Sequence, residues 1–197
     1  MIQRHFAIAI AVMALAAVGL SVYTWRARGR AVPLEPAAES RTVAPPVAGA
    51  TEQVTLYVAY DDPGLLLPQA AVIPLPGGRQ QRAEELLHSL IDLYVSKTSP
   101  HPLGPGADVR AVYLVDPGLA VIDLNSAFAE GHRSGIFVEE LTVVSLVETL
   151  TANVPGITRV KILVDGKEQD TLAGHADLSR FYDVSGANDL LTQMRSQ

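Results

Sequence analysis

Two hydrophobic periods alternate along residues 52–184, and they separate predicted strands from predicted helices. Short β-branched and apolar runs bounded by turn residues predict strands at 54–60, 65–75, 108–115, 119–124 and 159–164. Apolar residues recur at spacings of three and four over 80–94 and 137–154, which predicts two helices. The order β-β-α-β-β-α-β indicates an α+β fold, a two-layer sandwich of one mixed β-sheet with two helices on one face.

The second helix and the turn that follows the last strand are the sharpest local signals. Residues 137–154 carry a wide apolar face, so we expect Leu141 and Leu150 to pack on the sheet. The pair Asp165-Gly166 follows an apolar strand and is typical of a two-residue hairpin turn. Such a turn requires a positive φ at Gly166.

The chain divides into four parts by composition. Residues 1–30 are predicted to be an N-terminal membrane anchor or signal segment, because residues 6–25 carry no charge over a length that spans a bilayer. Cleavage near Ala17-Val18-Gly19 is the alternative, but the apolar run continues past it and favours an uncleaved transmembrane helix. A Pro/Ala-rich linker (31–51), the domain (52–184) and a polar C-terminal tail (185–197) follow.

The charges that flank the predicted anchor predict a cytoplasmic location for the domain. Arg26, Arg28 and Arg30 follow the span, whereas Arg4 and the terminal amine precede it. The positive-inside rule therefore places the domain in the cytoplasm. This count conflicts with the resemblance described below.

Composition excludes several classes of function. The chain has no cysteine, which excludes disulfides, thiolate catalysis, cysteine-ligated zinc and a lipid-modified cysteine. The net charge of the chain is −6. Basic residues outnumber acidic residues outside 52–184, so the domain itself is more acidic than the whole chain. An acidic domain argues against a nucleic-acid partner. No phosphate-binding glycine motif is present, and we expect no cofactor.

The segment Gly174 to Asp177 holds the best candidate for site chemistry. His175 and Asp177, with Asp165 and Asp170 nearby in sequence, are residue types that bind zinc or hard cations. A His-x-Asp pair supplies at most two ligands, however, and Asp side chains commonly cap turns. We favour turn capping and predict no metal.

Other histidines give weaker hypotheses. His132, Ser134 and Glu139 could imitate a base, nucleophile and orienting group, but they are crowded around a Gly-bounded loop, and we predict no catalytic set. His88 is predicted to be a solvated helix residue. His101 lies in a Pro-rich loop with no identifiable partner.

Several segments together resemble the GerMN domain family, which is named from a sporulation and spore-germination protein. The similar segments span about 53–179 and are Val121–Phe128, Glu148–Leu150, Val160–Lys167 and Leu172–Ser179. Two features depart from the family pattern. The first helix ends in Leu93-Tyr-Val-Ser96 rather than Gly-Pro, and the lipoprotein cysteine of many members is absent.

The resemblance implies an exported, non-catalytic module similar to the ring-building modules of envelope machines. The implied partners are an envelope protein or peptidoglycan, with self-association as a further option. It implies a single-pass protein of the cytoplasmic membrane with its domain on the extracytoplasmic side, against the arginine count. Gly174, His175 and Asp177 are the positions that it suggests for binding. The alternative hypothesis is a metal-dependent envelope hydrolase that uses His175 and Asp177.

Overall fold

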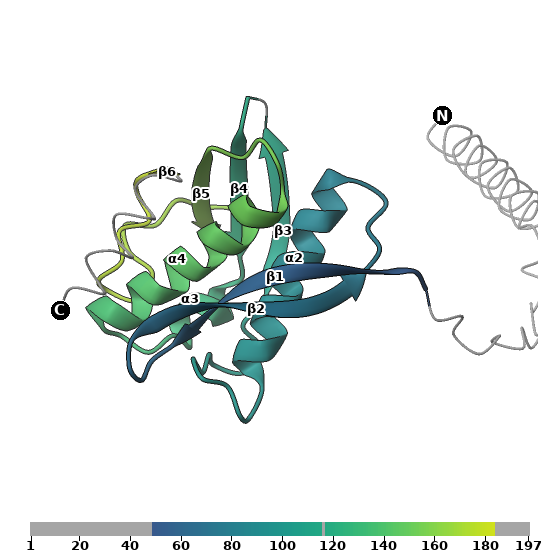
Figure 1. The fold of residues 1–197 in the computed structure, drawn as a ribbon. Coiled ribbons are helices and arrows are strands. Elements are labelled where there is room, and N and C mark those ends of the chain that lie inside the picture. The colour runs from purple at the N-terminus through teal and green to yellow at the C-terminus, as the bar shows by residue number, and fades with distance from the viewer. Residues whose placement is uncertain (1–48, 116, 184–197) are drawn as a thin grey trace, which may run out of the picture. The chain divides into compact units, whose positions relative to one another are not determined.

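A computed structural model describes residues 49–115 and 117–183, which form a mixed α+β fold with two sheets (Figure 1). An antiparallel ribbon of two strands contains β1 (Thr51–Tyr60) and β2 (Leu65–Pro74). A four-stranded sheet has the order β3 (Val109–Val115), β4 (Leu119–Leu124), β5 (Arg159–Val164) and β6 (Tyr182–Asp183). The helices are α2 (Arg79–Val95), α3 (Ser126–Glu130) and α4 (Ile136–Asn153).

The predicted elements follow one another as expected, and the short helix α3 and the short strand β6 are additional to the prediction. The prediction of one mixed sheet is wrong. The first two strands pair only with each other among the described strands, and the remaining four form a separate sheet. The physical reason lies at the outer edge of β1. Side chains of α4 and Tyr94 of α2 occupy that edge, so none of the described strands pairs there.

Polar side chains of α4 hydrogen-bond the backbone of β1 where a third strand would otherwise pair. Asn153 Oδ1 accepts from the Thr55 N–H (3.1 Å), and Asn153 Nδ2 donates to the Thr55 carbonyl (2.7 Å). Thr149 accepts from the Tyr57 N–H (3.0 Å), and Ser145 donates to the Tyr57 carbonyl (2.6 Å). Ser145, Thr149 and Asn153 are four residues apart, so one face of the helix satisfies the strand.

The opposite edge of the ribbon belongs to β2 and carries two prolines. Thr55 and Tyr57 point their backbone groups toward α4, so their partners Ala70 and Pro68 point theirs outward. Pro74 pairs with Thr51, so its backbone groups also point outward. Proline has no N–H and is tolerated at an edge. β2 is therefore an edge strand, as its prolines predict.

The four-stranded sheet combines both kinds of pairing. β3 and β4 form an antiparallel hairpin, β4 and β5 are parallel, and α3 and α4 make the crossover between them. The predicted turn after β5 is confirmed, because Asp165 and Gly166 have φ of 49° and 70°. Val164 and Lys167 close it with two backbone hydrogen bonds. Asp123 of β4 accepts from the Gly166 N–H (2.7 Å), which fixes the turn against the neighbouring strand.

Helix α4 is buried along most of its length. Every residue from Leu141 to Leu150 is buried, including both predicted core positions. The core joins residues of both sheets, α2 and α4 into one cluster. A helix buried on all sides does not cover one face of one sheet, so the predicted two-layer arrangement is too simple.

A buried lysine holds the C-terminal segment on the sheet. Lys161 Nζ donates to the carbonyls of Leu178 (3.0 Å) and Ser179 (2.7 Å), and its side chain is 5% exposed. The short strand β6 then pairs with the start of β5. This return places residues 172–182 beside α4, where Ala176 and Tyr182 lie close to Val143 and Val144.

The predicted anchor at 1–30, most of the linker and the tail at 185–197 lie outside the described residues. Among residues 49–115 and 117–183, none of the helices combines the length and the apolar character that crossing a membrane requires.

Candidate functional site

The segment Gly174 to Asp177 lies against the first turn of α4, and one carboxylate joins them. Glu139 is fully buried, and its Oε2 accepts from the N–H groups of Ala173, His175 and Ala176, each at 2.9 Å. Its Oε1 accepts from the Gly135 N–H at 3.0 Å. Four backbone donors thus converge on a single side chain.

His175 completes the shell around this carboxylate. The distance from His175 Nδ1 to Glu139 Oε1 is 2.9 Å, and the ring is 40% exposed. Burial alone raises the pKa of Glu139, but the Gly135 N–H, the His175 ring and the Ala176 and Ala173 N–H groups together lower it to about 2. Glu139 is therefore ionised, accepts only, and requires a hydrogen on Nδ1 of His175.

The two other predicted positions have local roles. Asp177 Oδ1 accepts from the N–H (2.9 Å) and hydroxyl (2.6 Å) of Ser179, so Asp177 caps a turn as predicted. Both bonds lower the pKa of its carboxyl group. Gly174 has a φ of +116°, which disfavours any side chain there. Turn capping does not describe His175, whose ring bonds a residue of α4 instead.

The metal hypothesis gains no support from the geometry. In residues 49–115 and 117–183, His, Asp and Glu side chains form no group of three or more that could hold a metal ion. Asp165 faces Arg110 at 3.4 Å, and Asp170 uses its backbone carbonyl to accept from Leu178. The four residues that the sequence brought together therefore have separate partners.

The structure also separates the possible catalytic set of His132, Ser134 and Glu139. Ser134 Oγ lies 3.3 Å from His175 Nδ1, the same nitrogen that faces Glu139. A hydrolytic triad needs the nucleophile on one ring nitrogen and the orienting carboxylate on the other. His132 faces Thr142 instead. These contacts therefore do not have the arrangement of a hydrolytic triad.

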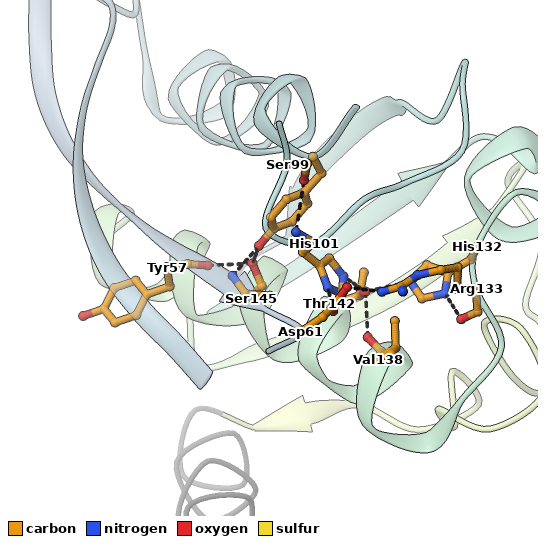
Figure 2. A network of polar contacts seen from close by, with 11 residues as sticks. Tyr57, Asp61, Ser99, His101, His132, Arg133, Val138, Thr142 and Ser145 are labelled. Atoms are coloured by element: carbon orange, nitrogen blue, oxygen red, sulfur yellow. Dashed lines mark hydrogen bonds and ion pairs between the residues drawn. The ribbon is translucent and has the colours of Figure 1, made fainter. Parts of the chain in front are cut away.

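A second cluster lies at the same end of α4 and was missed by the sequence analysis. Figure 2 shows His101, His132 and Asp61 converging near Thr142. His101 Nδ1 lies 2.6 Å from Asp61 Oδ1, and His101 Nε2 lies 2.6 Å from Thr142 Oγ1. His132 Nε2 lies 2.7 Å from the same hydroxyl, and Arg133 pairs with Asp61. The expectation that His101 lacks a partner is wrong.

This second cluster is buried, and burial shifts the pKa of both of its histidines. Both histidines are less than a tenth exposed. Burial lowers the pKa of His101, against the raising effect of Asp61. Burial likewise lowers the pKa of His132, against its bond to the Arg133 carbonyl. The partners of His101 lie about 40 residues away on either side, so local sequence gave no signal. His88, by contrast, is half exposed and contacts the Val109 carbonyl.

Beside the histidines lies a chain of hydroxyl groups in which the direction of every hydrogen bond is defined. The Tyr94 hydroxyl accepts from the Ala59 N–H (2.8 Å) and lies 2.5 Å from the Ser145 hydroxyl. The Ser145 hydroxyl in turn donates to the Tyr57 carbonyl. Each hydroxyl donates once and accepts once, so every contact is a hydrogen bond. Burial raises the pKa of Tyr94 to about 12, which keeps its proton in place.

Three solved structures are similar to the chain at low sequence identity. A putative lipoprotein from Clostridium perfringens is 22% identical, with a TM-score of 0.47, over 73% of this chain and 94% of that one. The tandem GerMN domains of the sporulation protein GerM from Bacillus subtilis are 21% identical, with a TM-score of 0.49, over 66% of this chain and 44% of that one. The first GerMN domain of that protein is 20% identical, with a TM-score of 0.47, over 68% and 98%.

No curated protein matches the chain. A family model does match, and its description is "Germane: Sporulation and spore germination". The match spans residues 55–170, from β1 to the loop after β5, and covers more than half of the chain. It confirms the resemblance to GerMN domains that the sequence motifs indicate. The protein therefore belongs to the Germane family of sporulation and spore germination.

Proposed function

We propose that this protein is a membrane-anchored module of the cell envelope that acts by binding a partner protein, not by catalysis. The observation that carries the proposal is the surface around the first turn of α4. Ile136 and Phe137 are 59% and 43% exposed there. Glu139, two residues further along the helix, fixes the adjacent segment Ala173 to Ala176.

This surface has the features of a recognition site. Large apolar side chains left in water favour association with a partner. The segment Ala173 to Ala176 beside them is held by three backbone hydrogen bonds to one buried carboxylate, so it is rigid before binding. Rigid polar groups beside an apolar contact reduce the entropy lost on binding. His175, partly exposed, supplies a polar contact at the edge.

The contacts of His175 support a non-catalytic role. Ser134 and Glu139 share its Nδ1, an arrangement that fixes two loops but does not activate a hydroxyl. Family membership supports a role related to sporulation or germination. The uncharged run at 6–25 supports the membrane anchor. The extracytoplasmic location of the domain is a further part of the proposal.

Site-specific photo-crosslinking in cells tests the proposed surface. A photoreactive amino acid at Phe137 is expected to capture one discrete protein. The matched control is Val115, which is 47% exposed on β3. Capture at Phe137 alone supports the proposal. Equal capture at both positions, or capture at neither, contradicts it, and co-sedimentation of the chain with purified peptidoglycan would assign the partner to the cell wall instead.

A topology experiment tests the proposed location separately. Alkaline phosphatase fused after Ser185 is active only outside the cytoplasm, whereas a green fluorescent protein fused there is fluorescent in the cytoplasm. We expect an active phosphatase and a dark fluorescent protein. The reverse pattern would place the domain in the cytoplasm, as the arginine count predicts.

A further inference from the structure

The hydroxyl group of Thr142 has three contacts, and it can bond all three groups only when both histidines donate to it. Its Oγ1 lies 2.6 Å from His101 Nε2, 2.7 Å from His132 Nε2 and 3.0 Å from the Val138 carbonyl (Figure 2). A hydroxyl group has one proton to donate and can accept two hydrogen bonds. The protonation of the two rings therefore decides which of the three contacts are hydrogen bonds.

The other nitrogen of each ring faces a group that only accepts. His101 Nδ1 faces Asp61 Oδ1 at 2.6 Å, and His132 Nδ1 faces the Arg133 carbonyl at 2.7 Å. Each Nδ1 must carry a hydrogen to bond these oxygens. When both rings are neutral, both Nε2 atoms are then acceptors. The one proton of Thr142 satisfies one of them and leaves the other facing an oxygen lone pair.

One added proton completes the bridge between the rings. The protonated ring donates its Nε2–H to Thr142, and Thr142 donates to the other ring. A second added proton makes both rings donors to the same oxygen, with Thr142 donating to Val138. Two cationic rings then lie with centroids 6.1 Å apart in a buried site. Like charges at this range repel, and burial strengthens the repulsion.

The surrounding charges do not neutralise two cationic rings. Asp61, from the β1–β2 turn, is the carboxylate in contact with His101, and Arg133 already pairs with it. Glu139 of α4 attracts His132 but is occupied by His175 and four N–H groups. Tyr94 of α2 presents an edge contact to His101 at 4.9 Å and keeps its proton. The cluster thus accommodates one added proton better than two.

We propose that His101, Thr142 and His132 form a proton-sensitive latch, which one proton closes and a second proton opens. Opening moves the His132 ring and the loop 131–135 away from α4. That loop carries Ser134, which faces His175, and Gly135, whose N–H binds Glu139. The latch therefore changes the segment Gly174 to Asp177 in acid. Burial lowers the pKa of both histidines, which places these steps below pH 6.5.

Histidine-selective NMR titration of the full chain in detergent micelles tests the latch. The five histidines of the chain can be assigned with single His→Gln variants. We expect His101 and His132 to titrate below pH 6.5, with each curve inflected at the midpoint of the other. The amide signals of Gly131, Gly135 and Gly174 should move with the second midpoint. His88 is half exposed and lies outside the latch, so His88→Gln is the control and should leave the movement of the glycine signals unchanged.

Two variants separate the latch from general acid effects. Thr142→Val keeps the shape of the side chain but removes the shared hydroxyl group, so the mutual inflections should disappear. His132→Gln removes one titrating ring, so His101 should follow a single curve and the glycine signals should no longer move at the second step. Independent single-step curves in the unmodified chain, or glycine signals that follow neither ring, would overturn the proposal even if a variant fails to fold.

Discussion

Glu139 and His175 are 36 residues apart in the sequence, and a contact of 2.9 Å between Oε1 and Nδ1 joins them. The same carboxylate accepts the N–H groups of Ala173, His175 and Ala176. The ring is therefore one of several donors, and most of the bonds that anchor this loop come from its backbone. The carboxylate, more than the histidine, determines where the loop lies.

Replacing the carboxylate should destabilise the protein more than removing the ring. Glu139→Gln leaves an amide whose own N–H groups face N–H donors, and we expect a loss of about 3 kcal/mol at pH 7 from the lowered pKa. His175→Ala, the matched control, should cost about 1 kcal/mol or less, since the ring is partly solvated. Urea unfolding measures both, and equal costs would contradict the assignment.

The stability contributed by Glu139 should depend on pH in a defined window. Because its folded pKa is about 2 and its ordinary value is 4.5, the contribution is complete above 4.5 and is lost as the pH falls from 4.5 toward 2. Glu139→Gln should show a shallower loss over that window when unfolding is followed at stepwise pH. A variant with the same acid slope as the unmodified chain would show that another group controls acid unfolding.

The core position Leu150 should be sensitive to truncation. Its side chain is fully buried in α4, so Leu150→Ala is expected to cost about 2–5 kcal/mol through lost burial and a cavity. Ile136→Ala, on the same helix but 59% exposed, should change the unfolding free energy by about 0.5 kcal/mol or less. Chemical denaturation of both variants compares the two sites. Similar costs at both positions would mean that the Leu150 side chain is not more buried than the Ile136 side chain.

Backbone strain, not crowding, should limit substitution at the turn after β5. Gly166 has a φ of +70° with no heavy atom within 4 Å of an added Cβ. Gly166→Val should therefore cost about 1–3 kcal/mol. Gly49 has equally open space without a positive φ, so Gly49→Val is the control and should be nearly neutral. Thermal unfolding decides, and a neutral Gly166→Val would exclude a left-handed residue there.

The prolines of β2 should keep its open edge from pairing with other chains. Replacing Pro68 and Pro74 by Thr restores two outward N–H groups, and we expect self-association that light scattering detects as an increased molar mass. Pro102→Thr, at an exposed position outside the strands, is the control and should leave the mass unchanged. If the double variant keeps the mass of the unmodified chain, another feature protects this edge.

Local patterns predicted most elements but not the way they assemble. The helix stripes placed α2 and α4 within a residue or so at each end, and Asp165-Gly166 predicted its turn, because those signals depend on neighbours in sequence. The division into two sheets depends on Ser145, Thr149 and Asn153 reaching β1, and periodicity does not record which polar helix residue bonds a strand.

The candidate site was harder to predict for the same reason. Asp177 bonds Ser179, two residues away, and its turn capping followed from residue type. His101 bonds Asp61 and Thr142, about 40 residues away in each direction, and no spacing rule links them. The sequence suggested Glu139 only as the orienting group of a catalytic set that we did not predict, and only the fold shows the loop that it binds.

The side-chain bonds between α4 and β1 have a consequence for the order of folding. They join residues separated by 88 to 98 positions, so Thr55 and Tyr57, on the outer edge of β1, stay without these partners until the chain has emerged as far as Asn153. Contacts this distant slow folding, because a long loop must close before they form. A chain delivered from its N-terminus would therefore complete its first two strands late, after its central helix has formed.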